Sequence, residues 1–456
     1  MDLFGTAGIR GPVTEVTPEL ALSVGRAVAG HVGAGAARTE VVVARDGRET
    51  GGALASAVEA GLASGGVNVR RAGQLPTPGL AFASQGRYGI MLTASHNPPA
   101  DNGIKLFADG TEFDREAEED IERRVSEGTT QAAWDGWGEA ERVDVLREYR
   151  EAVVSYAQRF GERPDGLEVA VDCGTGMASV GTPQVLTSLG ADVRALNANV
   201  DGHFPARESK PTAETITDLR AFVAEGPAAF GIGHDGDADR IVIVDESGEV
   251  VHEDTVLAIL AERYVRASDA ADPVVVTTPN ASGRIDERVT VAGGRVERVR
   301  LGALHEGIAA AREAGTSGTE VVFAAEPWKH VHPAFGGWID GIVSAAVLTS
   351  LIAEEGLDTL REPISERPYR KESVPCPDDR KEPAMAELEE SLPAAFPDAA
   401  VDTDYGVRLD LDGGAWTLVR PSGTEPYIRV YAESEDVDAL VSDVVAHVEN
   451  AIETQG

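Results

Sequence analysis

Short apolar runs alternate with longer amphipathic stretches through most of the chain. The runs at 40–45 (EVVVAR) and 88–92 (YGIML) predict strands, because both are short and rich in β-branched or aliphatic residues. The stretches at 17–32 and 51–64 predict helices, and the first of them begins with a capping Thr17 followed by Pro18. Strands that alternate with helices are typical of an α/β fold.

Three later apolar runs continue this pattern, and each leads directly into a polar or glycine-containing loop. They lie at 167–172 (LEVAVD), 273–277 (PVVVT) and 320–323 (EVVF). In open α/β sheets, ligands bind beyond the carboxyl ends of the strands. We therefore expect the functional residues in the loops that follow strands.

The length of the chain and the turn and proline signals along it indicate several domains. A chain of 456 residues is too long for one hydrophobic core, so three or four domains are expected. Boundaries are marked by a helix predicted at 144–160, a hairpin signal at 245–248 and repeated prolines after Gly356. The last segment has an α+β pattern that ends in a helix at 437–452. These signals predict domains at 1–145, 146–247, 248–360 and 361–456.

The charge balance is strongly acidic. The chain has 77 acidic and 40 basic residues, a net charge of −37, which disfavours binding to nucleic acid or to an anionic membrane. We interpret this charge as an adaptation to a salt-rich, halophilic cytoplasm. The absence of a signal-peptide pattern and of a long apolar run predicts a cytoplasmic protein. Cys173 and Cys376 do not have the spacing of a zinc site or a disulfide framework.

The first candidate loop, 93–98 (TASHNP), follows the strand at 88–92. A hydroxyl at a strand end, flanked by small and polar residues, exposes Ser95 for attack. In extended backbone the side chains of Ser95 and His96 point to opposite faces, so we expect His96 to orient the loop or contact phosphate and not to pair with the serine. Lys105 follows closely and can supply a proton or a positive charge. The alternative is a polar turn without a catalytic role.

The second candidate loop, 234–240 (HDGDADR), places Asp235, Asp237 and Asp239 at alternate positions. In an extended segment these carboxylates would project to one face. Close carboxylates repel one another unless a cation binds them, and ligation by oxygen alone suits Mg²⁺. An EF-hand is excluded because its sixth position, which requires glycine, is Arg240 here. The alternative is an acidic surface turn.

Two further loops carry weaker signals. In the loop 326–330 (EPWKH), Glu326 can accept hydrogen bonds from sugar hydroxyls and His330 can act as an acid or a base. In the loop 420–426 (RPSGTEP), the planar fork of Arg420 matches a phosphate, and hydroxyls and backbone N–H groups can complete an anion nest. Taken alone, the first is better explained as an ordinary polar loop, and a tight hairpin turn is the alternative for the second.

Together these loops indicate phosphoryl transfer. A serine hydroxyl, a cation site and a phosphate clamp supply the positioning and charge neutralisation that this reaction requires. The sequence has no G-x-x-x-x-G-K-[ST] motif, so ATP is not indicated as the donor. The phosphoryl group must then come from the substrate or from the enzyme itself.

In motif order over the whole chain, the sequence resembles the α-D-phosphohexomutase superfamily of phosphoglucomutases, phosphomannomutases and phosphoglucosamine mutases. The segment 4–11 (FGTAGIRG) resembles its N-terminal signature, 93–98 its phosphoserine loop, 235–240 (DGDADR) its metal loop and 420–426 its phosphate-binding loop. The resemblance implies an α/β fold of three similar domains with mixed sheets, plus a smaller C-terminal α+β domain, around a central active-site cleft.

The resemblance also implies a mechanism. Ser95 carries a phosphate in the resting enzyme, and Mg²⁺ is bound by Asp235, Asp237, Asp239 and a phosphoserine oxygen. A sugar monophosphate becomes a bisphosphate, whose other phosphate returns to Ser95, and a sugar bisphosphate primes the enzyme. The expected partner is a small phosphosugar, and the expected assembly is a monomer or a homodimer. The residues expected to transfer protons or stabilise charge are Lys105, Arg240, His330 and Arg10, and those expected to bind substrate are His96, Glu326, Lys329, Arg420, Ser422, Gly423, Thr424 and Arg429.

The sugar loop departs from the family pattern G-E-x-S-G-H. Residues 325–330 read AEPWKH, so Trp328 and Lys329 stand where the family has serine and glycine. Trp328 either stacks on the sugar or fills a domain interface. Glucosamine phosphate is the favoured substrate, followed by mannose or glucose phosphate, and a phosphopentomutase on the same scaffold is the alternative. A non-catalytic sugar-phosphate-binding protein is a further alternative, but its mark would be a lost serine or aspartate, and all of them are present.

Overall fold

The computed structural model describes residues 3–5, 8–33, 40–423 and 425–454. By compactness the chain divides into two units. The first unit comprises Met1–Val251 with Trp328–Leu360, and the second comprises His252–Pro327 with Arg361–Gly456. Within the described ranges, no helix combines the length and the apolar character needed to cross a membrane.

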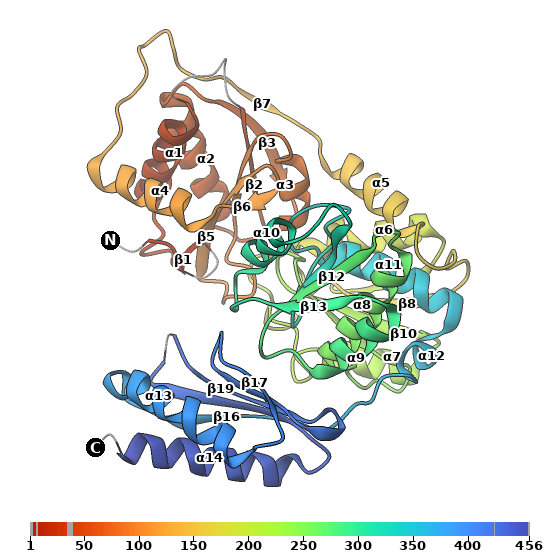
Figure 1. Cartoon of the computed structure of the whole chain (residues 1–456). Helices are drawn as coiled ribbons and strands as arrows, with labels where there is room; N and C mark the ends of the chain where they lie inside the picture. Colours follow the sequence, from red (N-terminus) through yellow and green to blue (C-terminus); the bar gives the residue numbers. More distant parts are fainter. Residues whose placement is uncertain (1–2, 6–7, 34–39, 424, 455–456) are drawn as a thin grey trace. The chain divides into compact units, whose positions relative to one another are not determined.

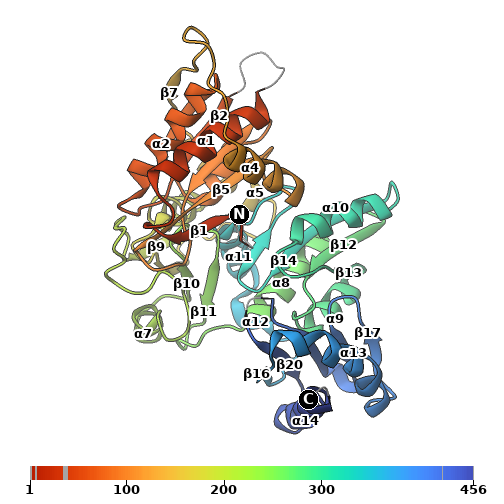
Figure 2. The same cartoon turned by 90° about the vertical axis from the view of Figure 1, so that its left-hand side faces the viewer.

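The first sheet of the first unit is mixed and has the order β1-β5-β4-β2-β3-β7, with β6 paired to β5. The strands β4, β2, β3 and β7 are parallel, whereas β5 is antiparallel to both of its neighbours. Helices α1 and α2 lie side by side against this sheet (Figures 1 and 2). The elements are β1 (Ile9–Pro12), α1 (Pro18–Val32), β2 (Glu40–Arg45), α2 (Gly51–Ser64), β3 (Asn68–Gln74), α3 (Thr77–Ala83), β4 (Tyr88–Leu92), β5 (Asp101–Ala108), β6 (Thr111–Glu112), α4 (Arg115–Glu127), β7 (Ala140–Arg142) and α5 (Leu146–Ala157).

The second sheet of the first unit has the order β11-β10-β8-β9, in which only β11 is antiparallel to its neighbour. Helix α11 (Gly341–Glu355) also belongs to this unit, is buried from Gly341 to Ile352, and packs against α5 and α6. The other elements are β8 (Glu168–Asp172), α6 (Thr182–Leu189), β9 (Asp192–Leu196), α7 (Thr217–Glu225), β10 (Phe230–His234), β11 (Ile241–Val244) and the short β15 (Lys329–Val331).

The second unit contains a parallel sheet in which β12 lies between β13 and β14. Three helices accompany these strands, and α8 packs against both α9 and β14. The elements are α8 (Glu253–Ala267), β12 (Asp272–Thr277), α9 (Gly283–Ala292), β13 (Arg295–Arg298), α10 (Leu304–Ala314) and β14 (Thr319–Glu326).

The C-terminal part of the second unit is a smaller, antiparallel sheet with the order β16-β20-β19-β18-β17. Apolar side chains of α13 and α14 share one core with alternate residues of these strands, so both helices cover the same face (Figure 1). Helix α12 (Leu357–Arg361) precedes this sheet, whose elements are β16 (Tyr369–Pro375), α13 (Asp378–Ala395), β17 (Ala400–Asp402), β18 (Val407–Asp410), β19 (Trp416–Pro421), β20 (Tyr427–Glu433) and α14 (Val437–Thr454).

The predicted fold class is confirmed: the chain is α/β, has several mixed sheets and ends in a smaller α+β part. The strands predicted at 40–45 and 88–92 and the helix predicted at 51–64 have the observed bounds of β2, β4 and α2. The helix predicted at 144–160 is shorter, because α5 ends at Ala157. The four domain boundaries stay a prediction.

Candidate active site

The candidate nucleophile lies in the loop that follows strand β4. Ser95 is 1 % exposed and has a left-handed backbone with φ 50°, a conformation that costs energy for a residue other than glycine. The hydroxyl of Thr93 accepts a hydrogen bond from the Ser95 backbone N–H at 2.9 Å. The Ser95 hydroxyl in turn donates to Oδ2 of Asp235 at 2.8 Å. The structure therefore joins the serine loop directly to the aspartate loop.

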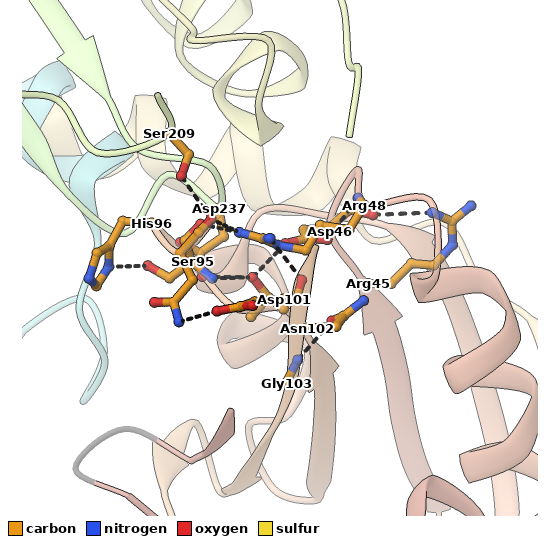
Figure 3. Close-up of polar contacts among 12 residues, drawn as sticks. Arg45, Asp46, Arg48, Ser95, His96, Asp101, Asn102, Gly103, Ser209 and Asp237 are labelled. Carbon is orange, nitrogen blue, oxygen red and sulfur yellow. Dashed lines mark hydrogen bonds and ion pairs between the residues drawn. The ribbon is translucent and has the colours of Figure 1, made fainter. Parts of the chain in front are cut away.

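The expectation that Ser95 and His96 cannot pair is wrong. Oγ of Ser95 lies 3.4 Å from Nδ1 of His96 (Figure 3). The expectation assumed an extended backbone, in which neighbouring side chains alternate, but the positive φ of Ser95 breaks that alternation. Burial, with the nearby charge of Arg240, lowers the pKa of His96 to about 3, so the imidazole is neutral at physiological pH.

Arg48 fixes the backbone of the serine loop through hydrogen bonds. Its guanidinium is fully buried, donates to the carboxylate of Asp46 at 3.0 Å, and also donates to four carbonyl oxygens of the loop and its end (Figure 3). These carbonyls belong to Ser95, Asn97, Pro98 and Asp101. A planar guanidinium has five N–H donors in a fixed fork, so this arrangement fixes the backbone around the nucleophile.

We expect Arg48→Lys to lower both turnover and stability. Lysine has only three donors on a single nitrogen, so at least two buried carbonyl or carboxylate groups would lose their partner, at a cost of about 2–4 kcal/mol in the free energy of unfolding. The loosened loop should lower kcat by roughly 10- to 100-fold, since small displacements of reacting groups are expensive. Urea unfolding and steady-state kinetics measure the two effects.

The matched control for this substitution is Arg26→Lys, because Arg26 of helix α1 makes a single side-chain hydrogen bond within the described ranges, to Ser64. That variant should retain turnover and most of its stability. Equal behaviour of the two variants would contradict the role given to Arg48.

The aspartate loop is a turn between β10 and β11, so the prediction of an extended segment is wrong. Ala238 has φ 61°, and its N–H bonds the carbonyl of Asp235 at 3.3 Å. The three carboxylates nevertheless converge, because the turn brings their ends together. Gly236 is required here, since a Cβ at this position would lie 2.7 Å from the carbonyl oxygen of Ser95.

Two neighbouring elements fix the aspartate turn. Thr77, at the start of α3, donates from its hydroxyl to Oδ2 of Asp237 at 2.6 Å, and its N–H bonds the Asp237 carbonyl at 3.0 Å. Helix α11 begins against the other side, where a Cβ at Gly341 would lie 2.7 Å from the carbonyl of Arg240. Asp340 caps that helix by accepting from Ile342 and Val343. The turn is therefore held by one helix start on each side.

The three aspartates have the geometry and the unmet hydrogen-bonding capacity of a cation site. One oxygen from each of Asp235, Asp237 and Asp239 lies within 4.8 Å of the others, and all three residues are buried. Oδ1 of Asp237 and Oδ1 of Asp239 have no hydrogen-bond partner among the described residues. Burial and the two neighbouring carboxylates raise the pKa of Asp235 well above its ordinary value. Orphaned, crowded carboxylate oxygens fit a hard divalent cation.

Cationic side chains surround the aspartates. The Lys105 ammonium is 3.2 Å from Asp239 and 4.0 Å from Asp237, and Nε of Arg240 is 3.8 Å from both Asp235 and Asp239. Burial alone would lower the pKa of Lys105, but the carboxylates of Asp239 and Glu112 raise it above its ordinary value. Lys105 is therefore a fixed positive charge at neutral pH.

Arg10 and Lys329 add charge at the edge of this cluster. Arg10 lies on β1 opposite Gly103 of β5, and its buried Nε has no hydrogen-bond partner within the described ranges. Burial alone would raise the pKa of Asp239, but Lys105, Arg240, Lys329 and Arg10 together hold it below its ordinary value. The predicted residues Arg10, Lys105 and Arg240 are thus brought to the aspartates with Lys329.

His330 and Trp328 flank Lys329 and make contacts with other side chains of the first unit. His330 is 2 % exposed, its Nδ1 is 2.9 Å from the hydroxyl of Ser344, and burial lowers its pKa to about 3. Trp328 has φ 69° and packs against the apolar cluster that contains Ile216 and Val242. Of the two roles considered for Trp328, packing against protein is the one that these contacts favour.

The remaining predicted residues belong to the second unit. Oε1 of Glu326 accepts a hydrogen bond from the N–H of Gly302. Arg420 and Arg429 lie directly opposite each other across β19 and β20. Their Nε atoms are buried without a hydrogen-bond partner among the described residues. Like charges at facing positions repel. Arg429 is ion-paired with Glu425, whereas Arg420 has no carboxylate partner among the described residues, so the pair keeps a positive charge that favours an anion.

The loop beside this arginine pair is held by Lys381 of α13. Its ammonium donates to the carbonyl oxygens of Ser422 and Glu425, at 2.8 and 2.6 Å. Ser422 is buried, Gly423 follows it, and the prediction for Thr424 lies outside the described residues. The loop is therefore tied across its two ends, as an anion-binding nest requires.

Several residues of the serine site were missed by the sequence analysis. They are Asp46 and Arg48, which follow β2, together with Thr77, Thr93 and Glu112. The first two could have been found by the rule used for the other loops, because they come directly after a predicted strand. Thr77 and Glu112 have no such signal, since tertiary contacts alone bring them to the site.

Comparisons with known proteins agree with this geometry. The chain matches family models described as phosphoglucomutase/phosphomannomutase α/β/α domain I at residues 1–132, α/β/α domain II at 147–248 and C-terminal domain at 374–451. It is 43% identical over 446 residues to a phosphopentomutase of Thermococcus kodakarensis, covering 95% of this chain and 94% of that protein. It is 42% identical over 443 residues to a probable phosphoglucosamine mutase of Methanopyrus kandleri, with the same coverage of both chains.

A solved structure shows the same fold. The crystal structure of a phosphoglucomutase/phosphomannomutase family protein from Burkholderia thailandensis superposes with a TM-score of 0.84 at 25% identity, covering 98% of this chain and 97% of that chain. Fold, site and relatives together define an isomerase that moves a phosphoryl group within a sugar phosphate. The chain belongs to the phosphoglucomutase/phosphomannomutase family.

Proposed function

We propose that this enzyme interconverts the 1-phosphate and 6-phosphate of a hexose or hexosamine through a phosphorylated Ser95 and a sugar bisphosphate. One observation supports this above all others: the Ser95 hydroxyl lies 2.8 Å from Asp235, one of three buried aspartates that share a candidate cation site. In the first half-reaction the bond between Ser95 Oγ and phosphorus breaks as a sugar hydroxyl oxygen bonds to phosphorus. The sugar hydroxyl releases its proton and Ser95 Oγ takes one up, and the second half-reaction reverses both proton transfers. In the second, the other phosphate of the bisphosphate returns to Ser95 Oγ.

Asp235, Asp237 and Asp239 would hold a Mg²⁺ ion, and Ser95 would complete the site through its oxygen or its phosphate. The bound ion would neutralise negative charge on the transferring group. The protein contributes the rest of the positive charge, because Lys105 and Arg240 lie against the same carboxylates. These cations give the site a local positive charge that would attract an anionic substrate, although the whole chain has a net charge of −37.

Two groups contact the Ser95 hydroxyl and are placed to handle its proton. Asp235 accepts its hydrogen bond, and the neutral imidazole of His96 is 3.4 Å away. Lys105, which keeps its proton at neutral pH, acts through charge and not as a base. These assignments give the roles of nucleophile, proton acceptor and charge stabiliser to separate residues.

The loop at Arg420–Gly423, with Arg429, would hold the phosphate that is not reacting. Its support comes from the facing arginines, their unpartnered Nε atoms and the fixed loop backbone. Glu326 and Lys329 would contact the sugar, and Thr424 completes the proposed set. A mutase needs such a clamp, because each of the two phosphates must be held while the other reacts.

Glucosamine phosphate is the substrate we favour, with mannose or glucose phosphate next. A relative of 42% identity is named a probable phosphoglucosamine mutase, which supports this choice. A pentose phosphate is the second candidate, because a relative of 43% identity is named a phosphopentomutase. In the sugar loop, Trp328 and Lys329 replace the usual serine and glycine, and this replacement also affects which sugar phosphate is preferred.

A substrate panel separates the two candidates. Purified protein in KCl, with Mg²⁺ and the matching sugar bisphosphate, is given glucosamine, mannose, glucose and ribose 1-phosphates, and each product is followed by phosphorus NMR. We expect kcat/KM to be highest for glucosamine 1-phosphate and at least tenfold lower for ribose 1-phosphate. A higher kcat/KM for ribose 1-phosphate would overturn the hexosamine assignment while leaving the mutase chemistry in place.

A further inference from the structure

A second cation-lined cavity lies in the first unit, outside the serine and aspartate site. Its volume is about 490 Å³, and it opens at the carboxyl ends of β2, β3 and β7, beside the first turns of α2. None of the residues that line it belongs to the serine loop or to the aspartate turn. Its charged lining residues are Arg45, Arg71, Arg142 and Glu59.

The charge of this cavity is opposite to that of the chain. Three arginines face one glutamate, whereas the whole chain has 77 acidic and 40 basic residues. Arg71 is paired with Glu59 at 2.5 Å. Arg45 and Arg142 have no carboxylate within ion-pair distance in the described part of the chain, and Arg45 donates only to the backbone carbonyl of Asp46. Uncompensated arginines around one cavity favour an anion in it.

Helix α2 adds a second positive feature. Its N-cap residue, Thr50, makes no side-chain capping hydrogen bond. Gly52, in the first turn, lines the cavity, and a Cβ at this position would meet no atom within 4 Å, so the backbone there is open. The N–H groups of Gly51 and Ala53 in this turn already bond the carbonyl oxygens of Arg48 and Thr50. What the helix start contributes is its partial positive charge, which favours phosphate.

Apolar residues form part of the remaining cavity wall, together with Ser56, Gly52 and Gly73. Val43, Ala44, Ala55, Ala72 and Val143 line it beside the arginines. The volume falls within the range of about 300–1,000 Å³ that is common for small-molecule sites, and it exceeds what a single phosphate ion would fill. The combination suits a ligand with one phosphate group and an organic part.

We propose that this cavity is a second binding site for a phosphate monoester, separate from the reaction centre. The guanidinium groups of Arg45 and Arg142 bind the phosphate, and the apolar wall contacts the organic part. The site is adjacent in sequence to the scaffold of the nucleophile: Arg45 precedes Asp46, whose carboxylate binds Arg48, and Arg48 holds the Ser95 loop.

Calorimetric titration with phenyl phosphate and with inorganic phosphate, at constant KCl, tests the proposal. Arg420→Gln weakens the clamp of the reaction centre and isolates the second site. In that background we expect phenyl phosphate still to bind, and Arg142→Gln to raise its Kd at least tenfold. Inorganic phosphate should bind more weakly than the ester. Arg142 is exposed, so its substitution should leave the melting temperature unchanged.

The matched control is Arg147→Gln, which removes an exposed arginine from the nearby helix α5 and leaves the cavity intact. It should bind phenyl phosphate like the parent protein. Equal Kd values for the Arg142 and Arg147 variants would overturn the proposal, as would loss of all binding in Arg420→Gln alone. Inorganic phosphate that binds as tightly as the ester would overturn the assignment to a monoester.

Discussion

Ser95→Ala should lower kcat by about 10⁴-fold or more, because it removes the only atom proposed to carry the phosphoryl group between the two half-reactions. The neighbouring hydroxyl of Thr93 is not placed to replace it, since it donates to Asp46 at 2.7 Å. The measurement is steady-state turnover of a sugar 1-phosphate with saturating bisphosphate. Intact mass after incubation with bisphosphate should show one added phosphate on the parent protein and none on the variant.

Ser209→Ala is the control for this prediction. Its hydroxyl donates to the carbonyl of Asn97 at 3.2 Å, so the variant alters the same loop without touching the nucleophile (Figure 3). We expect its kcat to stay within about threefold of the parent, since it loses one neutral hydrogen bond of roughly 1 kcal/mol. A Ser95 variant that kept a tenth of the parent activity would show that the phosphoryl group travels by another route.

Asp237→Asn should lower kcat by about 10³-fold, equivalent to roughly 4 kcal/mol of lost transition-state stabilisation. Asparagine keeps the size of the side chain and can still accept from Thr77, but it removes one of the three charges that would hold the cation. Turnover as a function of Mg²⁺ concentration measures the loss.

The same substitution makes an unusual stability prediction. Without metal, Asp237→Asn should raise the melting temperature, because it relieves repulsion among three buried carboxylates. The parent protein should gain stability on adding Mg²⁺, and the variant should gain little. Asp443→Asn, on the exposed face of α14, is the control and should respond to Mg²⁺ like the parent. A variant that kept the parent's Mg²⁺ response would exclude Asp237 as a ligand.

The sequence predicted the elements that carry the site because their signals are local. The strand at 88–92 and the helix at 51–64 have clear apolar patterns and clear ends, and the structure has them at the same residues. The rule that ligands bind beyond strand ends located Ser95, and the alternate spacing of its three aspartates located the aspartate turn. The distance of 2.8 Å between the Ser95 hydroxyl and Asp235 results from tertiary packing, which local sequence patterns do not predict.

The errors arose where backbone conformation departs from an extended chain. Ser95 and Ala238 both have positive φ, at 50° and 61°. Neither residue is glycine, the usual sequence signal for positive φ, so the sequence did not predict these conformations. The assumption of an extended backbone led to the wrong expectation that Ser95 and His96 are separated. It also gave the wrong reason for the convergence of the three carboxylates. Both departures lie at the site, where surrounding contacts support strained backbone.

Arg48 shows a different limit of sequence interpretation. In the sequence, Arg48 cannot be distinguished from any other polar residue that follows a strand. In the structure it is buried and donates hydrogen bonds to four carbonyl oxygens of a distant loop. Its importance depends on burial and on partners about 50 positions away. Structure is needed to find residues of this kind, which hold reacting groups without touching them.

A crystal structure of the enzyme with Mn²⁺ in place of Mg²⁺ tests the central claim most directly, since the anomalous signal of manganese locates the ion without assumptions about its ligands. The account predicts one strong peak in contact with Asp235, Asp237, Asp239 and the oxygen or phosphate of Ser95. An active crystal whose manganese lay elsewhere, or whose three aspartates bound no ion, would contradict it.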